Sequence, residues 1–392
     1  MGISLKVGII GDTGRGNYVH GLDLAYEGLD QFDVVAVSDP DPVGLNDAVN
    51  RIGASRYYKD YREMLDKEQL DVVSVCPRWV GKHREMIIAA AESGAKAIFC
   101  EKPIAATLAH GDEIMDLCNR KGVRVAVAHR RANMYEEYGK QIIERGDLGD
   151  ILSIKARGKE DHRSGATDLM VLGTHLMDSM RYMAGSEVQW VYGRVTQDEN
   201  EISMVDVREG DEEIGLIAGN GVDAFYSFNN GISGYFESHP QSADITTATD
   251  TKLTRSSRSF GFEVYGTEGI ISIRCSPCSE FYQYPHGRWI PDGIDGNWER
   301  VIIDDWDIRP DGSLYTANER TDMSNKIIAR EIHAAILNDR DIENVSSGSD
   351  AVADLEMIMG IHQSQITRSR VYFPMENRDN PYETWLNSES IK

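Results

Sequence analysis

The stretch Leu5-Lys-Val-Gly-Ile-Ile10, followed directly by Gly11-Asp-Thr-Gly14-Arg-Gly16, decides how the N-terminal part of the chain folds. The apolar, β-branched run predicts a strand that is buried on both faces. In a dinucleotide-binding βαβ unit, glycines after such a strand allow a tight turn and a close approach of the backbone to a pyrophosphate. Gly11 and Gly16 occupy the outer positions of this pattern, and Thr13 stands at the middle position with Gly14 beside it. The turn therefore matches the pattern with one departure.

The same organisation continues as far as residue 128, because short apolar runs alternate with helical patterns. We expect strands over residues 6–10, 34–38, 72–75, 97–100 and 124–128. We expect helices over about residues 17–28, 42–52, 60–66, 81–93 and 107–120. This alternation predicts an α/β domain over residues 1–130, with the doubly wound parallel sheet of a Rossmann fold.

After residue 128 the pattern changes to that of an α+β domain, which we place over residues 131–392. Strands that alternate apolar and polar residues predict a large, mainly antiparallel open sheet with flanking helices. The expected strands include 151–157, 224–228, 234–238, 262–265 and 270–274, and the expected helices are 135–145, 168–184, 322–338 and 349–366. The last helices are candidates to pack back on the first domain, and residues 242–259 and 291–312 are expected to be loops.

Composition limits the kinds of partner. The chain has 392 residues, which favours two domains, and a formal net charge of -23, which disfavours nucleic acid and anionic membranes as partners. There is no secretory pattern and no apolar run long enough for a membrane span, so we expect a cytoplasmic protein. Cys275 and Cys278 have no obvious second pair of ligands, and we expect no metal site.

Asp39 ends the second expected strand. A carboxylate at this position accepts hydrogen bonds from the adenosine ribose hydroxyls and repels a 2'-phosphate. No arginine or lysine follows it directly, so we expect NAD rather than NADP as the cofactor. The alternative is an ordinary aspartate in a loop at the end of a strand.

Cys76-Pro77-Arg78 and Glu101-Lys102-Pro103 each follow a later strand of the same sheet directly. Open parallel sheets bind ligands outside the carboxyl ends of their strands, so both tripeptides are expected at the ligand edge. A lysine at that edge can hydrogen-bond a substrate hydroxyl and stabilise a developing alkoxide. The alternative for Lys102 is a solvated loop lysine.

An ordered series of motifs resembles the Gfo/Idh/MocA oxidoreductases, the group of glucose-fructose oxidoreductase and the inositol dehydrogenases. The resemblance spans nearly the whole chain. Its motifs are the glycine-rich turn, Asp39, Cys76-Pro77 with His83, Ser93-Gly94, Glu101-Lys102-Pro103, His175, Tyr265-Gly-Thr-Glu-Gly269 and Arg370-Val-Tyr-Phe-Pro374.

The resemblance implies hydride transfer at a carbinol carbon of a sugar, cyclitol or glycoside, with Lys102 close to the nicotinamide. It also implies that His175, in Leu172-Gly-Thr-His175-Leu-Met-Asp178, is the general acid/base. Imidazole titrates near neutrality, which suits that role. In this family the exposed face of the second-domain sheet commonly mediates self-association, so a homo-oligomer, dimer or tetramer, is expected.

The candidate residues form three groups. The expected catalytic residues are Lys102 and His175. The expected cofactor-binding residues are Gly11, Thr13, Gly14, Arg15, Gly16, Asp39, Cys76, Pro77, Arg78, His83, Glu101 and Lys102. The expected substrate contacts are Arg130, Arg131, Asp161, His162, Arg163 and Asp178.

Two positions depart from the family pattern. Many dehydrogenases of the family carry an aspartate four residues before the histidine, whereas this chain has Val171 there, and its nearest carboxylate is Asp168. The segment from Pro77 to His83 is also two residues longer than the common form. Arg78 and Trp79 in this segment are expected either to alter the nicotinamide pocket or to cover the sheet edge.

Two other functions stay open. The first is a glycoside-cleaving enzyme that oxidises a sugar carbon, eliminates next to the carbonyl and reduces the product again, so that NAD is recycled. The second is a sugar or cofactor sensor without turnover, for which we expect loss of Lys102 or His175, and both residues are present.

Overall fold

The computed structural model describes residues 4–15, 19–240, 259–276, 278–286 and 297–389. The chain divides into two compact units. The first contains Met1–Ala132, Asp211–Gly215 and Asn318–Ala353, and the second contains Asn133–Gly210, Leu216–Ala317 and Asp354–Lys392. Each unit is therefore built from stretches that are far apart in the sequence.

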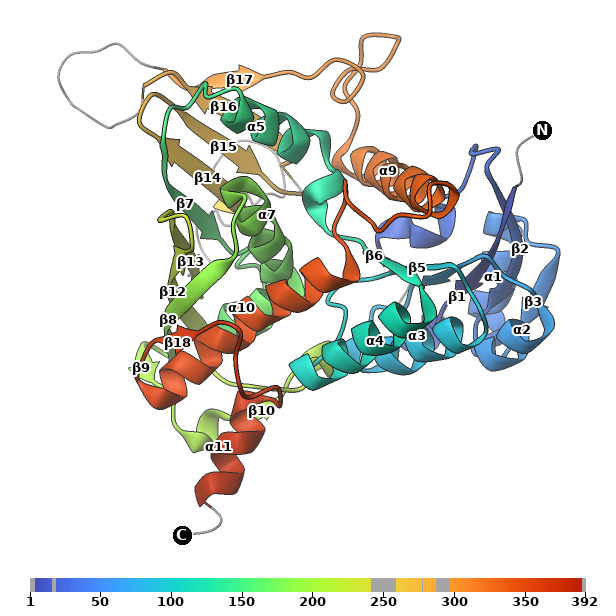
Figure 1. The fold of residues 1–392 in the computed structure, drawn as a ribbon, viewed down its shortest axis with the longest axis horizontal. Helices are drawn as coiled ribbons and strands as arrows, with labels where there is room; N and C mark the ends of the chain where they lie inside the picture. The colour runs from blue at the N-terminus through green and yellow to red at the C-terminus, as the bar shows by residue number, and fades with distance from the viewer. Residues whose placement is uncertain (1–3, 16–18, 241–258, 277, 287–296, 390–392) are drawn as a thin grey trace. The chain divides into compact units, whose positions relative to one another are not determined.

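The first unit contains a six-stranded parallel sheet with the order β3-β2-β1-β4-β5-β6 (Figure 1), which confirms the predicted Rossmann fold. The strands are β1 (Leu5–Ile10), β2 (Phe32–Ser38), β3 (Arg56–Tyr58), β4 (Val72–Val75), β5 (Ala97–Cys100) and β6 (Arg124–Val127). The sequence pattern missed β3, which has only three residues and no buried side chain. The strand order reverses between β1 and β4, and this is the switch point where such sheets bind ligands.

The helices of the first unit mostly agree with the expected ranges. They are α1 (Pro42–Ile52), α2 (Tyr61–Lys67), α3 (His83–Glu92), α4 (Leu108–Lys121) and α9 (Ala317–Leu337), with short 3₁₀ turns η1 (Thr13–Arg15), η2 (Val19–Leu24), η3 (Val80–Lys82), η4 (Arg130–Ala132) and η7 (Asp211–Glu213). The helix predicted over residues 17–28 was wrong as far as the structure describes that range. His20 and Gly21 have φ values of 60° and 69°, and this left-handed backbone interrupts a helix.

Apolar side chains from α9 complete the core of the first unit. Ile328, Ala329 and Ile332 are buried in one cluster with residues of the parallel sheet such as Val7 and Val37. A helix from the last quarter of the chain therefore covers a sheet that is built from the first third, because the apolar faces of the strands need cover on both sides.

The second unit contains a ten-stranded sheet with the order β17-β16-β15-β14-β7-β13-β12-β8-β18, and β9 pairs with β8. The only parallel pair among these described strands is β13 with β7, so the predicted antiparallel sheet is confirmed. The strands are β7 (Ile151–Arg157), β8 (Val188–Gln197), β9 (Asn200–Glu201), β12 (Gly221–Phe228), β13 (Ser233–Ser238), β14 (Gly261–Gly266), β15 (Ile270–Arg274), β16 (Glu280–Tyr284), β17 (Glu299–Val301) and β18 (Val371–Tyr372). A separate ribbon pairs β10 (Arg208–Glu209) with β11 (Leu216–Ile217), after the 3₁₀ turn η6 (Met204–Asp206).

The range 291–312, expected to be a loop, contains β17, because Glu299–Val301 pairs with β16. Polar composition alone concealed this short edge strand. Residues 242–258 of the other expected loop lie outside the described part of the chain, as do residues 291–296.

Helices cover one face of the large sheet. They are α5 (Met134–Glu144), α6 (Gly165–Asp168), α7 (Thr174–Ala184) and α10 (Gly348–Thr367), with a π-helical turn η5 (Leu169–Gly173) between α6 and α7. The last helix, α11 (Pro381–Glu389), contacts β11 and is joined to α10 by a hydrogen bond between Tyr382 and His362. The Tyr226 hydroxyl donates to the Met357 carbonyl at 3.2 Å, and the Gly193 N–H donates to Ser364 Oγ at 2.9 Å. These bonds fix α10 against β12 and β8. Within the described residues, no helix has the length and apolarity needed to cross a membrane.

Candidate active site

The glycine-rich turn of the first unit is tied to the end of β2 through Asp39. This side chain is fully buried. The Thr13 N–H donates to Asp39 Oδ2 at 3.1 Å, and the Asp41 N–H donates to Oδ1 at 2.9 Å. Thr13 and Arg15 lie in η1, whereas Gly16 lies outside the described residues. Asp39 therefore holds the turn at the ligand edge of the sheet, next to the ends of β1 and β2.

A cavity of about 320 Å³ opens at this edge. It is lined by Gly11, Asp12, Ser38, Pro40, Lys59, Asp60, Tyr61, Arg62, Lys82, Glu85 and Met86. A glycine backbone on one side and the end of β2 on the other are the surroundings that the adenosine half of a dinucleotide requires. The residues present thus fit NAD, and Gly11, Ser38 and Pro40 are the ones that would hold it there.

The turn that carries Lys102 is anchored by Glu101. Both side chains are buried, Glu101 to 1% exposed and Lys102 to 7%. His20 Nδ1 lies 3.0 Å from Glu101 Oε1, and the Lys102 N–H donates to Oε2 at 3.1 Å. Burial by itself would raise the pKa of Glu101, but His20 and Lys102 outweigh it and lower that pKa. Glu101 is therefore a carboxylate that fixes the direction of the turn.

His83 joins the two turns of the ligand edge. Its imidazole is fully buried, with Nε2 2.8 Å from the Pro77 carbonyl oxygen and Nδ1 2.8 Å from the Pro103 carbonyl oxygen. Burial lowers the pKa of His83, although both carbonyls act in the opposite direction. Cys76, in the first of these turns, is also buried, and its N–H donates to the Ile10 carbonyl at 3.0 Å. The turns after β4 and β5 are thus one connected structure.

Arg78 forms an ion pair with Glu212. Glu212 belongs to the short stretch that joins the first unit from the middle of the sequence. This partner could not be predicted from the sequence, because 134 positions separate the two residues and no motif contains Glu212.

Of the two arginines after β6, Arg131 is 10% exposed and forms an ion pair with Asp350 at 3.1 Å. Arg130 lies beside it in η4 and is partly buried. Both were expected to contact substrate, which stays a prediction, and the Arg131 guanidinium has a carboxylate partner within its own unit.

In the second unit, His175 is the second residue of α7 and is 8% exposed. The preceding turn η5 is a π-helix, a form that often occurs at functional sites. Val171 lies within η5 and is buried, so the position four residues before His175 offers no carboxylate. The sequence predicted one continuous helix from residue 168 and could not reveal the wider turn.

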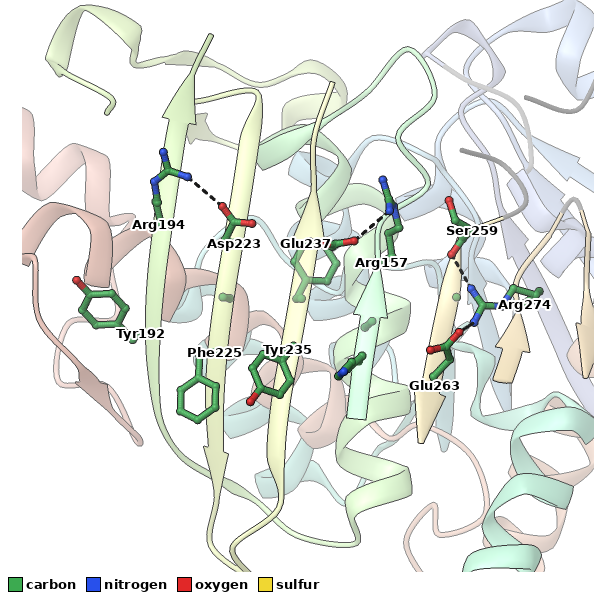
Figure 2. A pocket seen from close by; sticks show the side chains of 15 residues that line it. Arg157, Tyr192, Arg194, Asp223, Phe225, Tyr235, Glu237, Ser259, Glu263 and Arg274 are labelled. Carbon is green, nitrogen blue, oxygen red and sulfur yellow. Dashed lines mark hydrogen bonds and ion pairs between the residues drawn. The ribbon is translucent and has the colours of Figure 1, made fainter. Parts of the chain in front are cut away.

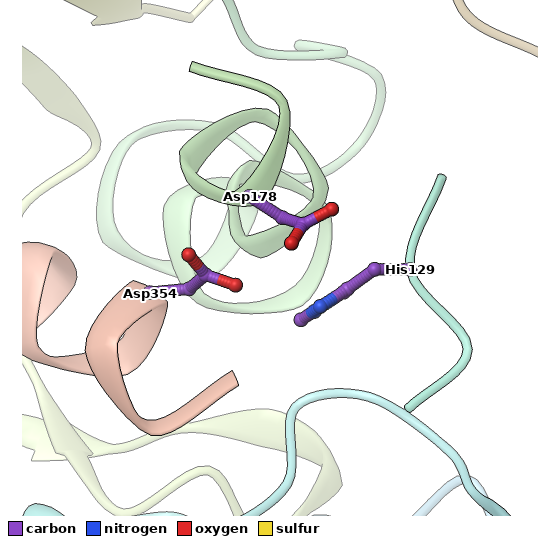
Figure 3. Close-up of side chains that lie close together, drawn as sticks. All are labelled: His129, Asp178 and Asp354. Carbon is purple, nitrogen blue, oxygen red and sulfur yellow. The ribbon is translucent and has the colours of Figure 1, made fainter. Parts of the chain in front are cut away.

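Asp178, one turn after His175, is fully buried close to Asp354 of α10. A carboxylate oxygen of Asp178 lies within 4.8 Å of one of Asp354. Figure 3 shows these two side chains close together. Arg181 donates to Asp354 Oδ1 at 3.2 Å and to Glu187 Oε1 at 2.7 Å. Asp178 therefore lies on the same helix as His175, close to the buried Arg181–Asp354 ion pair.

Asp168 binds a different part of the second unit. Its Oδ2 accepts hydrogen bonds from Ser238 Oγ at 2.8 Å and from the Glu160 N–H at 3.1 Å. Burial raises the pKa of Asp168 to about 6, although both hydrogen bonds act to lower it. Asp168 thus fixes the loop that follows β7.

That loop carries the remaining candidates. Arg163 donates to both carboxylate oxygens of Asp161, at 3.0 and 2.7 Å, whereas the His162 side chain is 78% exposed. Burial would raise the pKa of Asp161, but Arg163 and Lys159 lower it well below its usual range. Asp161 and Arg163 therefore form a fixed charged pair, and the exposed His162 has its Nδ1 3.4 Å from Asp161 Oδ1.

Comparison with known families agrees with this architecture. Residues 5–129 match the oxidoreductase family with an NAD-binding Rossmann fold, and residues 138–272 match the Gfo/Idh/MocA C-terminal domain. The chain therefore belongs to the Gfo/Idh/MocA family of oxidoreductases, as its motifs predicted. Its first unit is the NAD-binding domain of that family.

Several curated relatives are sugar or cyclitol dehydrogenases. The chain is 29% identical to myo-inositol 2-dehydrogenase of Thermotoga maritima over 50% of its own length and 60% of that protein. It is 28% identical to levoglucosan dehydrogenase of Pseudarthrobacter phenanthrenivorans over 68% of its own length and 73% of that protein. The match therefore spans less than two thirds of the inositol dehydrogenase.

A solved structure of levoglucosan dehydrogenase in complex with NADH and levoglucosan has the same fold. It superposes with a TM-score of 0.73 at 21% identity and covers 95% of this chain and all of that one. A second neighbour, an NAD-binding oxidoreductase from Klebsiella pneumoniae, superposes with a TM-score of 0.70 at 20% identity, over 94% of this chain and 98% of that one.

Proposed function

We propose that this chain is an NAD-dependent dehydrogenase or reductase that acts on the CH–OH carbon of a sugar, cyclitol or glycoside. The observation that carries the proposal is the Lys102 turn, which Glu101 and His83 hold at the ligand edge of an NAD-binding sheet. The relatives that are named inositol and levoglucosan dehydrogenases support the same class of substrate.

His175 is the proposed general acid/base, which takes the hydroxyl proton during oxidation and returns it during reduction. Lys102 is the proposed polarising group, because an ammonium next to the substrate oxygen stabilises the charge that develops as the proton leaves. NAD, when bound, supplies the redox chemistry by accepting or giving two electrons with one hydrogen at the nicotinamide. With Val171 buried and apolar, these two side chains are the proposed acid/base set.

The test follows NADH formation and product release together, with NAD and a panel that includes myo-inositol, levoglucosan and D-glucose. We expect Lys102→Ala and His175→Ala to lower kcat by about a hundredfold or more, because each removes a group from the transition state. In His175→Ala, NADH affinity should stay close to that of the unsubstituted protein. Lys96→Ala and His110→Ala are the matched controls, since these side chains are exposed and belong to no candidate site.

The outcomes separate the remaining alternatives. Product release without net NADH would identify the glycoside-cleaving enzyme that recycles NAD. If no compound changes either signal, the dehydrogenase proposal is wrong and the sensor function is favoured.

We also propose a cytoplasmic location and self-association. All five cysteines lie within the described residues, and none of them forms a disulfide, as expected in a reducing compartment. The proposed contact surface between copies is the uncovered face of the large sheet, a shallow cavity of about 870 Å³ shown in Figure 2.

The uncovered face is suited to a second copy because its charges are already paired within the sheet. One row across the strands contains the ion pairs Arg194–Asp223 at 3.4 Å and Arg157–Glu237 at 3.1 Å. The next row contains the rings of Tyr192, Phe225 and Tyr235, and the last two rings lie 5.2 Å apart. Aromatic and arginine side chains are enriched where protein surfaces become buried in an interface.

A further inference from the structure

An acidic segment from the middle of the chain lies on the ligand edge of the Rossmann unit. Asp211-Glu212-Glu213 forms η7 between β10 and β11, and residues 211–215 belong to the first unit although both neighbouring stretches belong to the second. The segment packs against η3, which follows the turn after β4. The segment therefore lies at the same edge of the sheet as the turns expected to bind NAD.

The segment is held there by one ion pair and one close backbone approach. Glu212 pairs with Arg78, and its side chain is 14% exposed. Glu213 lies directly against Gly81, where an added Cβ would come within 2.9 Å of Glu213 Cβ. Glu212 and Glu213 have φ values of 64° and 56°, a left-handed backbone that non-glycine residues adopt only when their surroundings impose it.

Arg78 is connected to the Lys102 turn through His83. Arg78 follows Pro77, whose carbonyl lies 2.8 Å from His83 Nε2, and His83 Nδ1 lies 2.8 Å from the Pro103 carbonyl. Val75 and Cys100 are register partners at the ends of β4 and β5. Because the carboxyl ends of these parallel strands share one edge, the Arg78–Glu212 pair and Lys102 both belong to turns at the edge where such sheets bind ligands.

We propose that Glu212 is a specificity-determining residue that makes this site select uncharged sugars over sugar acids. A guanidinium is the side chain best suited to bind a substrate carboxylate, since it offers two parallel N–H donors. Glu212 occupies the Arg78 guanidinium from within the protein. A carboxylated sugar therefore has to displace Glu212 and meets repulsion, whereas a neutral polyol does not. The inference rests on the proposed function, because it names the substrate charge for the same site.

The test compares D-glucuronate with D-glucose, two pyranoses that differ in a carboxylate at one carbon. Their affinities for the NADH complex are measured by titration of NADH fluorescence, and this needs no turnover. We expect Glu212→Gln to increase the affinity for D-glucuronate about tenfold, the effect of one additional charge-assisted hydrogen bond. Its affinity for D-glucose should change by less than about twofold, as for an ordinary surface substitution.

Asp211→Asn is the matched control, because it removes the same charge one residue away from the pair. It should leave the preference of the site between the two sugars almost unchanged. The double variant Arg78→Gln/Glu212→Gln should lose the gain, and Glu212→Ala provides a second way to release Arg78.

Three results would overturn the inference. The first is that D-glucuronate affinity does not increase in Glu212→Gln or in Glu212→Ala. The second is that it increases in Asp211→Asn as much as in Glu212→Gln. The third is that the increase persists in the double variant. Absence of NAD-dependent oxidation of every polyol would instead count against the proposed function, since the titration does not depend on it.

Discussion

Gly44 occupies a position in α1 where the Thr13 side chain takes the space that a Cβ would need. An added Cβ would come within 2.6 Å of Thr13 Cβ, so Gly44→Ala has to displace the turn that Thr13 shares with Asp39. We expect NADH affinity to fall about tenfold, because overpacking costs on the order of 1–3 kcal/mol and acts here on the binding turn. Fluorescence titration of NADH measures the change.

The double variant Thr13→Gly/Gly44→Ala removes the Thr13 side chain, which the added Cβ at position 44 would overlap. It should recover most of the lost NADH affinity. Unchanged NADH affinity in Gly44→Ala would show that the turn tolerates displacement, contrary to this account.

Asp168 gives the second unit a pH-dependent stability. Its pKa is raised to about 6 in the fold, above the usual value of 3.8. Between these two values the folded state binds the proton that the unfolded state has released, so stability falls as pH rises through this window. Asp168→Asn removes the ionisation. We expect the free energy of unfolding of this variant, minus that of the unsubstituted protein, to be about 2 kcal/mol more favourable to the variant at about pH 7.5 than at about pH 4.5. Denaturant unfolding at both pH values measures the change.

Asp161→Asn is the control with the opposite sign. The pKa of Asp161 is lowered, so its contribution is present above its unfolded pKa of 3.8 and is lost only as pH falls below that value. Its stability difference should therefore stay nearly constant over the same pH interval. A constant difference for Asp168→Asn as well would show that this carboxyl is not protonated in the fold.

At the scale of elements, α9 is fastened to the turn that follows it by Glu331. Arg340 donates to both Glu331 oxygens, at 2.6 and 2.9 Å, and the Asn344 side chain donates at 3.0 Å. Burial would raise the pKa of Glu331, but these partners lower it to about 2. Stability from this carboxylate is therefore present above its usual pKa of 4.5 and is lost as pH falls toward 2.

We expect Glu331→Gln to destabilise the first unit by roughly 2 kcal/mol near neutral pH, since it leaves charge-assisted hydrogen bonds without their acceptor. The difference from the unsubstituted protein should shrink below about pH 4. Hydrogen exchange of the amides in residues 338–347 measures the local effect. Protection that is equal in both proteins at neutral pH would contradict it.

A helix or strand could be predicted from the sequence where the pattern of its own residues determines its secondary structure. The buried strands β4 and β5 match the expected ranges because continuous apolar runs can be satisfied only inside a parallel sheet. The expected helix after the glycine turn failed because His20 and Gly21 adopt a left-handed backbone. The π-helical turn before His175 could not be predicted from the sequence either, since the apolar pattern is helical on both sides of this single wide turn.

At the scale of the whole molecule, the uncovered face of the second-unit sheet is the proposed contact surface between copies. Tyr235 is 41% exposed at the centre of this face, and we expect Tyr235→Lys to convert an oligomer into a monomer, because an unpaired charge would be buried in the interface. Sedimentation velocity measures the change. Tyr57→Lys, at a more exposed tyrosine of β3, is the matched control and should leave association intact.

A monomeric unsubstituted protein at micromolar concentration would contradict the proposed interface. Dissociation by both tyrosine variants alike would show that added charge, rather than the sheet face, is responsible.

The sequence by itself determined the two fold classes, the family and the order of the cofactor turns, because these depend on local periodicity and on motifs with fixed spacing. Only the tertiary structure decided which side chains are engaged inside the protein. In the folded protein, Asp39 is buried and accepts a hydrogen bond from the glycine turn, and His83 lies between two turns. Asp168 accepts a hydrogen bond from Ser238, and Glu212 forms an ion pair with Arg78. These contacts join positions from 20 to 134 residues apart. Local patterns contain no information about such pairs, since their free energy arises only when folding removes both groups from water together.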